Sequence, residues 1–338
     1  MFDNVKVGVI GCGGMGSQHA RNLAEIEGAD LRALADVNLD AAERLKREVG
    51  GKYCTADPQD LFYDEQIDLV LICTHHHLHL PFAVQAADAG KDIFVEKPLA
   101  LTIKECEQIE STVERTGVKL MVGFQARFSP FMKKLKQSVP NPLVIVGQMV
   151  DPRWGDDSWA NDPIEGGGNV LSQGCHLLDA ICWLAGSEPV SIYAEGGNFT
   201  HPKIPEITDS IVSTIRFANG CVASAVIGDF GAPALVGKGF YELFGGDKTA
   251  TLSGYYNTPA IKFWGIEPQT FTMDNLPAEL RDGSVAHGYV GEMEALISWV
   301  RSGIDPMEAA KVGDGLKATK LAVKAIEAIK SRVPQELP

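Results

Sequence analysis

Residues 5–36 read VKVGVIGCGGMGSQHARNLAEIEGADLRALAD, and this stretch decides the fold. Gly11, Gly13 and Gly16 stand in G-x-G-x-x-G spacing, directly after a strand-like apolar run and directly before a helical pattern. Glycine lets the chain turn sharply and brings its backbone close to a pyrophosphate, whose charge is favoured by the exposed amides of a helix N-terminus. The stretch therefore predicts a strand, a loop and a helix that together bind a dinucleotide.

The residue that closes the second apolar run selects the cofactor. Asp36 stands twenty positions after Gly16, at the end of DLRALAD. A carboxylate at this point can accept hydrogen bonds from the adenosine ribose hydroxyls, and it would repel a 2′-phosphate. We therefore predict NAD as the cofactor in preference to NADP. The cofactor-binding residues predicted from this part of the chain are Gly11, Cys12, Gly13, Gly14, Met15, Gly16 and Asp36.

Up to residue 123 the chain alternates short apolar runs with segments rich in Ala, Glu, Leu, Lys and Arg. The runs are VKVGVIG, DLRALAD, IDLVLICT, KDIFVEK and VKLMVGF. Such alternation is typical of parallel strands joined by helices, and the nearly continuous hydrophobicity of the runs indicates strands that are covered on both faces. We predict an α/β fold whose residues 1–123 form an NAD-binding Rossmann domain with a doubly wound parallel sheet.

After Phe124 the pattern changes to long strand-like stretches without helices between them. The Asn-Gly pair of FANGCV and the glycine-rich turn of FGGDKTATL favour tight hairpins. Two helices are expected near the end, over residues 288–303 and from about Pro306 to Arg332. We predict that residues 124–338 form an α+β domain for substrate binding and oligomerisation, with a large open, mainly antiparallel sheet.

The composition narrows the class of partner. The chain has 338 residues, 45% of them hydrophobic, and a formal net charge of -14, which argues against nucleic acid and against an anionic membrane surface. Its seven cysteines show no CxxC spacing, and no segment reaches the roughly 18 apolar residues that a membrane span requires. We expect a cytoplasmic protein that acts on a small molecule.

Two further motifs carry polar residues that could do chemistry. The tripeptide Glu96-Lys97-Pro98 follows a predicted parallel strand, at the sheet edge where ligands bind in doubly wound folds. A helix that begins near Asn169 places Ser172, His176 and Asp179 on one face. Taken alone, a lysine before proline is usually a solvated turn residue, and a single histidine on an apolar helix is usually structural. Their significance depends on the fingerprint upstream.

Together these pieces resemble the glucose-fructose oxidoreductase and inositol dehydrogenase family of nicotinamide-dependent sugar and polyol oxidoreductases. The resemblance covers nearly the whole chain. It rests on the glycine fingerprint and on four later features, which are EKP at 96–98, GFQARFSP at 123–130, SWANDPIEGGG at 158–168, and His176 with Asp179.

The resemblance implies hydride transfer between nicotinamide and a secondary hydroxyl of a cyclic polyol, a monosaccharide or a glycoside. Lys97 would hydrogen-bond the reacting hydroxyl, and His176 would accept its proton. Histidine titrates near neutral pH, and an ammonium group favours a forming alkoxide. The resemblance also implies a homodimer or homotetramer. Further cofactor contacts would come from Thr74, His75, His79, Glu96, Lys97 and Gln125, and substrate contacts from Arg127, Arg153, Trp159, Asn169, Ser172 and Asp179.

The chain departs from the family pattern at two places. Ser172 stands where relatives usually have an aspartate, so His176 should be a weaker base, or the substrate should carry a different hydroxyl pattern. In ICTHHHLHL the residues Thr74 and His79 match the family, whereas His75 and His76 depart from it. Consecutive histidines in one short loop do not supply a closed tetrahedral ligand set, so we predict no metal.

Two alternative functions use the same parts. One is a glycoside-processing enzyme that retains NAD, oxidises the sugar transiently and eliminates a substituent. The other is an NAD-binding regulatory protein without turnover, because a fold alone does not guarantee activity. The presence of both Lys97 and His176 favours an enzyme.

Overall fold

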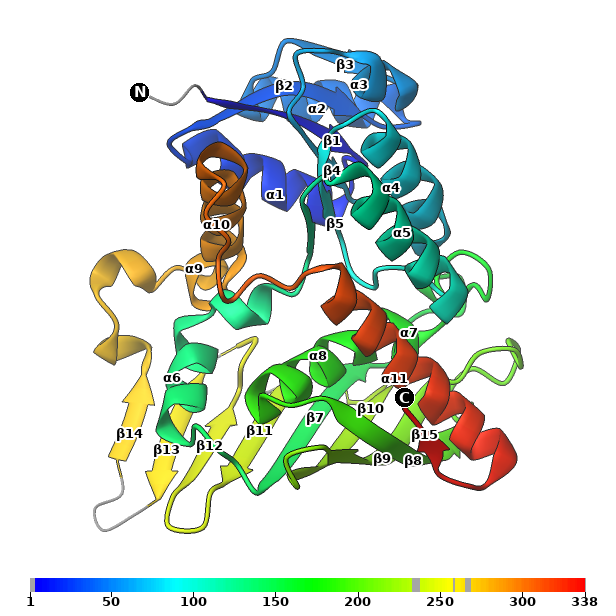
Figure 1. Cartoon of the computed structure of the whole chain (residues 1–338), viewed down its shortest axis with the longest axis vertical. Helices are drawn as coiled ribbons and strands as arrows, with labels where there is room; N and C mark the ends of the chain where they lie inside the picture. The colour runs from blue at the N-terminus through cyan, green and yellow to red at the C-terminus, as the bar shows by residue number, and fades with distance from the viewer. Residues whose placement is uncertain (1–3, 233–237, 258, 265–268, 338) are drawn as a thin grey trace. The chain divides into compact units, whose positions relative to one another are not determined.

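The computed structural model describes residues 4–232, 238–257, 259–264 and 269–337 (Figure 1). The chain forms two compact units, Met1–Gln125 with Tyr289–Leu316 and Ala126–Gly288 with Lys317–Pro338. The sequence places its change of pattern after residue 123 and gives no sign that residues 289–316 return to the first unit. We describe each unit by itself.

The first unit contains a sheet of six parallel strands in the order β3-β2-β1-β4-β5-β6. This topology confirms the predicted doubly wound parallel sheet. The central strands are apolar and buried on both faces, as in the fully buried LVLI of β4. The strands are β1 (Val5–Ile10), β2 (Ala29–Ala35), β3 (Tyr53–Thr55), β4 (Leu69–Ile72), β5 (Asp92–Val95) and β6 (Leu120–Val122).

Local sequence signals set the ends of the helices in this unit. In α5, Thr102 and Glu105 form a reciprocal capping box, and Gly117 ends the helix in the left-handed conformation. The helix α1 packs against β2 and against α10. The helices are α1 (Gly14–Glu25), α2 (Leu39–Val49), α3 (Gln59–Tyr63), η1 (His76–Leu78), α4 (His79–Asp88), α5 (Ile103–Thr116) and α10 (Tyr289–Ser302).

The second unit contains a nine-stranded sheet in the order β14-β13-β12-β11-β7-β10-β9-β8-β15. All neighbours are antiparallel except β7 and β10, which run parallel, so the predicted open and mainly antiparallel sheet is confirmed. The strands are β7 (Val144–Pro152), β8 (Pro189–Gly197), β9 (Ser210–Phe217), β10 (Val222–Gly231), β11 (Gly239–Phe244), β12 (Thr249–Ser253), β13 (Ala260–Trp264), β14 (Gln269–Thr272) and β15 (Gln335–Glu336).

Both predicted hairpins are present. Between β9 and β10 the Phe217 amide donates to the Cys221 carbonyl, and Gly220 has a φ of +89°, which favours glycine. Between β11 and β12, Phe244 pairs with Thr249 across the second glycine-rich turn. The two turn signals in the sequence therefore fix the pairing of four strands.

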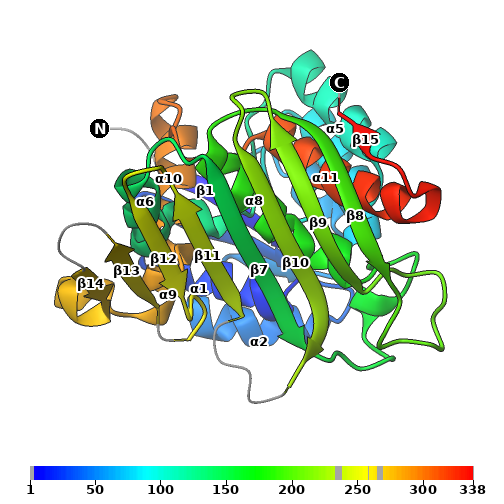
Figure 2. The same cartoon turned by 90° about the horizontal axis from the view of Figure 1, so that it is seen from below.

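One face of this sheet is covered by α8 (Gly174–Ala185), which packs against β7 and β10 (Figure 2). A Cβ atom on Gly147 of β7 would lie 2.8 Å from the Leu177 side chain, so glycine is needed for the close approach. Burial of leucine and isoleucine side chains here contributes about 1.5–3 kcal/mol each. The other helices are η2 (Gln125–Phe128), α6 (Pro130–Ser138), η3 (Trp159–Asn161), α7 (Asn169–Ser172), η4 (Met273–Asn275), η5 (Ala278–Leu280), α9 (Gly283–Ala286) and α11 (Val312–Ser331).

The opposite face of the sheet is the more exposed one within the described residues. In β9 the burial pattern alternates from Ile211 onward, so that Val212, Thr214 and Arg216 point outward while Ile211 and Ile215 are buried. Val144 of β7 and Val222 of β10 lie opposite each other and are also exposed. This face is therefore a partly apolar surface that a partner could cover.

Candidate active site

The glycine-rich loop between β1 and α1 has the geometry of a phosphate cradle. Gly11 has a φ of +90°, and a Cβ atom there would lie 2.4 Å from the Cys73 carbonyl oxygen. A Cβ atom on Gly16 would lie 1.8 Å from the Gly11 carbonyl oxygen. Gly13 and Gly14, in contrast, have no neighbouring atom within 4 Å of a Cβ position, so their backbone faces open space. Two glycines allow the loop to pack, and two leave room for a ligand to approach.

Asp36 is held beside this loop by two backbone amides. Its Oδ2 accepts a hydrogen bond of 2.7 Å from the Cys12 N–H, and its Oδ1 accepts one of 2.8 Å from the Asn38 N–H. A carboxylate oxygen has lone pairs for more than one donor, so both oxygens can still accept from a ribose hydroxyl. The two amides thus orient the carboxylate that the sequence singles out.

A pocket of about 360 Å³ opens at this edge of the parallel sheet. It brings together five of the predicted cofactor residues, Gly11, Gly13, Asp36, Thr74 and His75. The sequence analysis did not predict the apolar part of the pocket wall. Its residues belong to the carboxyl ends of the strands and to the segments that follow them, where ligands bind in such folds. It consists of Ile10, Ala35, Val37, Ala56, Pro58, Cys73, Leu78 and Phe82. Glycine amides, one carboxylate and apolar walls fit a dinucleotide.

Other predicted cofactor residues do not line this pocket. Cys12 is buried, and burial together with the charge of Asp36 raises the pKa of its thiol to about 12, so it stays protonated. His79 is fully buried, and its ring nitrogens lie 2.7 Å from the Pro98 carbonyl oxygen and 3.2 Å from that of Thr74. Burial lowers the pKa of His79. It therefore braces two backbone segments from within. Gly14, Met15, Gly16, Glu96, Lys97 and Gln125 are likewise absent from the pocket wall.

Glu96 and Lys97 follow β5 at the same carboxyl edge of the sheet. The Glu96 carboxylate is buried, and its Oε2 accepts a hydrogen bond of 3.1 Å from the Lys97 backbone N–H. Its Oε1 lies 2.7 Å from Nε2 of His19, a residue that the sequence analysis did not select. Burial acts to raise the pKa of Glu96, but the His19 hydrogen bond and the nearby positive charge lower it overall.

In the second unit, the predicted single helix through His176 is broken. The segment α7 ends at Ser172, and α8 begins at Gly174, with Gln173 between them. The His176 N–H donates to the Gln173 carbonyl at 3.0 Å. Ser172 and His176 are both buried. The break means that their relative placement does not follow from ideal helical spacing.

Asp179 is engaged by Arg127, so these two predicted substrate residues form a pair. Arg127 Nε donates to Asp179 Oδ2 at 3.0 Å, and Arg127 Nη2 donates to Oδ1 at 2.5 Å. The side chains are 6% and 2% exposed. A bidentate contact of this kind fixes both groups, because separating them would leave a buried charge uncompensated.

Asn169 belongs to a polar network that includes three residues the sequence analysis missed, Asp151, Gln173 and Lys238. Its Nδ2 donates to Asp151 Oδ2 at 3.3 Å. The Lys238 ammonium lies 2.7 Å from Asp151 Oδ1 and donates to Gln173 Oε1 at 3.2 Å. The network places a cation, a carboxylate and two amides around the α7–α8 junction, a mixture that suits a polyhydroxylated ligand. Lys238 belongs to no motif, so its position could be found only from the structure.

Arg153 lies in the loop after β7 and braces neighbouring backbone. Its Nε donates to the Thr200 carbonyl at 3.0 Å, and its Nη2 pairs with Asp156. Trp159 in η3 is 38% exposed. Both of these predicted substrate residues are exposed at the surface of the described chain.

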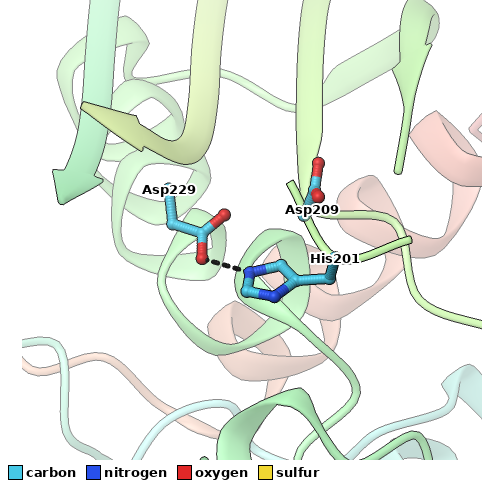
Figure 3. Close-up of side chains that lie close together, drawn as sticks. All are labelled: His201, Asp209 and Asp229. Carbon is cyan, nitrogen blue, oxygen red and sulfur yellow. Dashed lines mark hydrogen bonds and ion pairs between the residues drawn. The ribbon is translucent and has the colours of Figure 1, made fainter. Parts of the chain in front are cut away.

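A buried cluster that the sequence analysis did not identify lies near the same loop. His201, Asp209 and Asp229 are fully buried, and their potential ligand atoms lie within 4.8 Å of one another (Figure 3). His201 Nε2 lies 2.6 Å from Asp229 Oδ2, and its Nδ1 lies 2.9 Å from Asp156 Oδ1. Asp209 accepts backbone N–H bonds from Phe199 and Thr200. Since these donors and acceptors already satisfy one another, we interpret the cluster as a brace between loops.

Comparison with known proteins identifies the class of protein. Residues 5–124 match the oxidoreductase family with an NAD-binding Rossmann fold, and residues 141–247 match the GFO/IDH/MocA C-terminal domain. The chain belongs to the GFO/IDH/MocA family of oxidoreductases, and its first domain is an NAD-binding Rossmann domain. The resemblance seen in the sequence and the predicted NAD cofactor are thereby confirmed.

Individual relatives include other oxidoreductases. An uncharacterised oxidoreductase of Bacillus subtilis is 31% identical over 230 residues, which cover 66% of this chain and 67% of that protein. The myo-inositol 2-dehydrogenase of Thermotoga maritima is 31% identical over 229 residues, which cover 64% of this chain and 66% of that protein. A levoglucosan dehydrogenase solved with NADH has the same fold, with a TM-score of 0.87, 22% identity, and coverage of 99% of this chain and 100% of its own. Among the described residues, no helix is long and apolar enough to cross a membrane.

Proposed function

We propose that this chain is an NAD-dependent dehydrogenase that oxidises a secondary hydroxyl of a cyclic polyol, a monosaccharide or a glycoside. One observation supports the use of NAD most strongly. The open glycine backbone and the oriented Asp36 carboxylate line the same pocket. Bound NAD supplies the nicotinamide carbon that accepts hydride. The relatives that are inositol dehydrogenases, and the levoglucosan dehydrogenase of the same fold, favour inositols and sugars as the substrate class.

The polar residues of the two units suit the remaining chemistry. We assign Lys97 the role of donating a hydrogen bond to the oxygen of the reacting hydroxyl, where its ammonium would favour negative charge. We assign His176 the role of accepting the hydroxyl proton. We assign Asn169 and Lys238, which both contact Asp151, to substrate hydroxyls, because an amide and an ammonium group can donate hydrogen bonds to a sugar.

Asp179 has a different role in this proposal from the one expected from the sequence. Both of its oxygens accept hydrogen bonds from the buried Arg127, and we propose that this pair fixes α8, the helix that carries His176. Ser172 supplies only a neutral hydroxyl where a carboxylate would strengthen the base. We therefore propose that His176 acts without a carboxylate from position 172.

A substrate panel tests the proposed reaction. The protein is mixed with NAD and a set of inositols, aldoses and glycosides, and the absorbance of NADH is followed. Accumulation of NADH that is lost in Lys97→Ala and His176→Ala variants, each still binding NAD, supports the dehydrogenase. Cleavage of a glycoside without net NADH would indicate transient oxidation by retained NAD. Binding of NAD without conversion of any substrate would favour a regulatory protein.

We further propose a homodimer or homotetramer that assembles through the outer face of the nine-stranded sheet. The exposed Val144, Val212 and Val222 support this proposal, since an apolar sheet face of this kind is often buried by a symmetry mate. A cytoplasmic location is consistent with seven free cysteines. Light scattering of the protein, compared with a Val212→Lys variant, tests the interface, and a monomeric wild type would contradict it.

A further inference from the structure

His19 and Glu96 form a buried pair beneath the glycine-rich loop. His19 lies in α1, one helical turn after Gly16, and Glu96 directly follows β5. His19 Nε2 lies 2.7 Å from Glu96 Oε1, and the side chains are 0% and 8% exposed. The two residues are 77 positions apart in the sequence, so the contact exists only because the sheet brings α1 to the end of β5.

The surroundings of this pair are shaped to hold it. The His19 ring meets Phe94 edge to face, with centroids 5.0 Å apart and an interplanar angle of 71°. A Cβ atom on Gly123 would lie 3.2 Å from the Glu96 carboxylate oxygen Oε2, so glycine at that position leaves room for the carboxylate. Aromatic packing on one side and a glycine on the other fix both partners in one arrangement.

Hydrogen bonding determines which ring nitrogen carries the proton. His19 Nδ1 is buried and has no hydrogen-bond partner among the described residues. A proton on Nδ1 would create a buried N–H without an acceptor, which is unfavourable. The Nε2 position, in contrast, faces a carboxylate oxygen. The arrangement therefore favours a proton on Nε2, which is donated to Glu96.

We propose that His19 is a positioning residue for Lys97, acting through Glu96. The Nε2–H of His19 donates to Oε1 of Glu96, and Oε2 of Glu96 accepts the backbone N–H of Lys97. This chain of contacts ties the helix that cradles the cofactor phosphates to the lysine that addresses the substrate hydroxyl. The inference rests on the proposed role of Lys97 and extends it to a residue in the glycine-loop helix.

The ionisation of Glu96 is the property that His19 controls. Among the described residues, the titratable groups that interact with Glu96 are His19, Lys97, Cys73 and His79, and Tyr289 of α10 meets the His19 ring edge to face. The wild-type pKa of Glu96 is lowered although burial acts to raise it, and the His19 hydrogen bond is the leading cause of the lowering. Without that donor, burial dominates, and the carboxylate should take up a proton at a higher pH.

Three variants test this proposal. His19→Leu removes the donor, and His19→Gln keeps an N–H at the same number of bonds from the backbone. Arg21→Gln is the control, because Arg21 lies on the same helix in an exposed ion pair with Glu48. We expect His19→Leu to lower kcat by about ten- to a hundredfold, as for a lost hydrogen bond to a charged group. Its acidic limb of the pH profile should move to higher pH, while the Kd for NAD stays within about threefold. His19→Gln should restore most of kcat and the original limb.

Two measurements do not depend on turnover. In the wild-type protein, ¹⁵N NMR of labelled histidine should show His19 protonated on Nε2 and bare on Nδ1. In ¹³C NMR, the carboxyl resonance of Glu96 should titrate at a higher pH in His19→Leu than in the wild type. These results stand even if no substrate is oxidised, so failure of the proposed dehydrogenase is distinguishable from failure of this inference. The inference would be overturned if His19 of the wild type is protonated on Nδ1, or if the Glu96 titration is unchanged in His19→Leu. It would also be overturned if His19→Leu loses stability and NAD affinity together without a shift of the acidic pH limb.

Discussion

The buried pair of Arg127 and Asp179 allows a quantitative test of how the second unit is held together. Two hydrogen bonds of 3.0 Å and 2.5 Å join the side chains, and both side chains are more than nine-tenths buried. Removal of one partner leaves the other charge buried without compensation. We expect this to lower the free energy of unfolding by about 3–5 kcal/mol. Replacement of both by apolar groups removes the uncompensated charge, so the double variant should lose less than the sum of the single variants.

The assay is a double-mutant cycle. Arg127→Met, Asp179→Leu and the double variant are unfolded in urea, and the transition of the second unit is followed by fluorescence. We expect each single variant to lose about 3–5 kcal/mol and the double variant to recover at least about 2 kcal/mol of the summed loss. If the two losses simply add, the pair is not coupled in solution. If Asp179→Leu unfolds normally and only raises KM, Asp179 contacts substrate instead of serving the fold.

Three other perturbations give distinct outcomes. Gly16→Ala should destabilise the first unit, because its Cβ would lie 1.8 Å from a carbonyl oxygen. Gly13→Ala should leave the unfolding temperature unchanged but weaken NAD binding, and calorimetry can measure both effects. Burial acts to lower the pKa of His201, but hydrogen bonds to two carboxylates outweigh it and raise the pKa. The contribution of protonated His201 to the free energy of unfolding is therefore complete below a pH of about 6.5, and it is lost as the pH rises through the higher pKa of the folded state. The difference in unfolding temperature between wild type and His201→Gln should therefore shrink from pH 6 to pH 9, and a constant difference would contradict this. Ser172→Asp should move the acidic limb of the turnover profile, and an unchanged limb would exclude coupling to His176.

The parallel sheet could be predicted because its strands are continuous apolar runs and its first loop carries three spaced glycines. β3 escaped prediction, since Tyr53–Thr55 is only three half-buried residues long and has no run of its own. The hairpins of the second sheet followed from their Asn-Gly and glycine-rich turns. The parallel pairing of β7 with β10 has no turn signal, because the two strands are joined through α7, α8, β8 and β9.

The candidate site was predictable where a short motif carries it. The glycine loop, Asp36 and the EKP lysine all lie at strand ends, where sequence alone indicates exposure to a ligand. The contacts between side chains in the second unit could not be predicted in this way, because they join residues that are far apart in the chain. Arg127 and Asp179 are 52 positions apart, and Lys238 and Gln173 are 65 apart, so only the fold brings them together. The break at Gln173 also changes the relative placement of Ser172 and His176, and a prediction that assumes one ideal helix misses this change.

Direct transfer of hydride from a substrate carbon to NAD is the central claim, and one isotope experiment tests it. An inositol or sugar found to be oxidised is prepared with deuterium on the carbon that bears the reacting hydroxyl. The reduced cofactor is then isolated and analysed by mass spectrometry and NMR. The proposed function predicts one deuterium at C4 of the nicotinamide, and a slower reaction than with the unlabelled substrate. Reduced cofactor without deuterium, or deuterium that is lost to solvent without reduction of NAD, would contradict it.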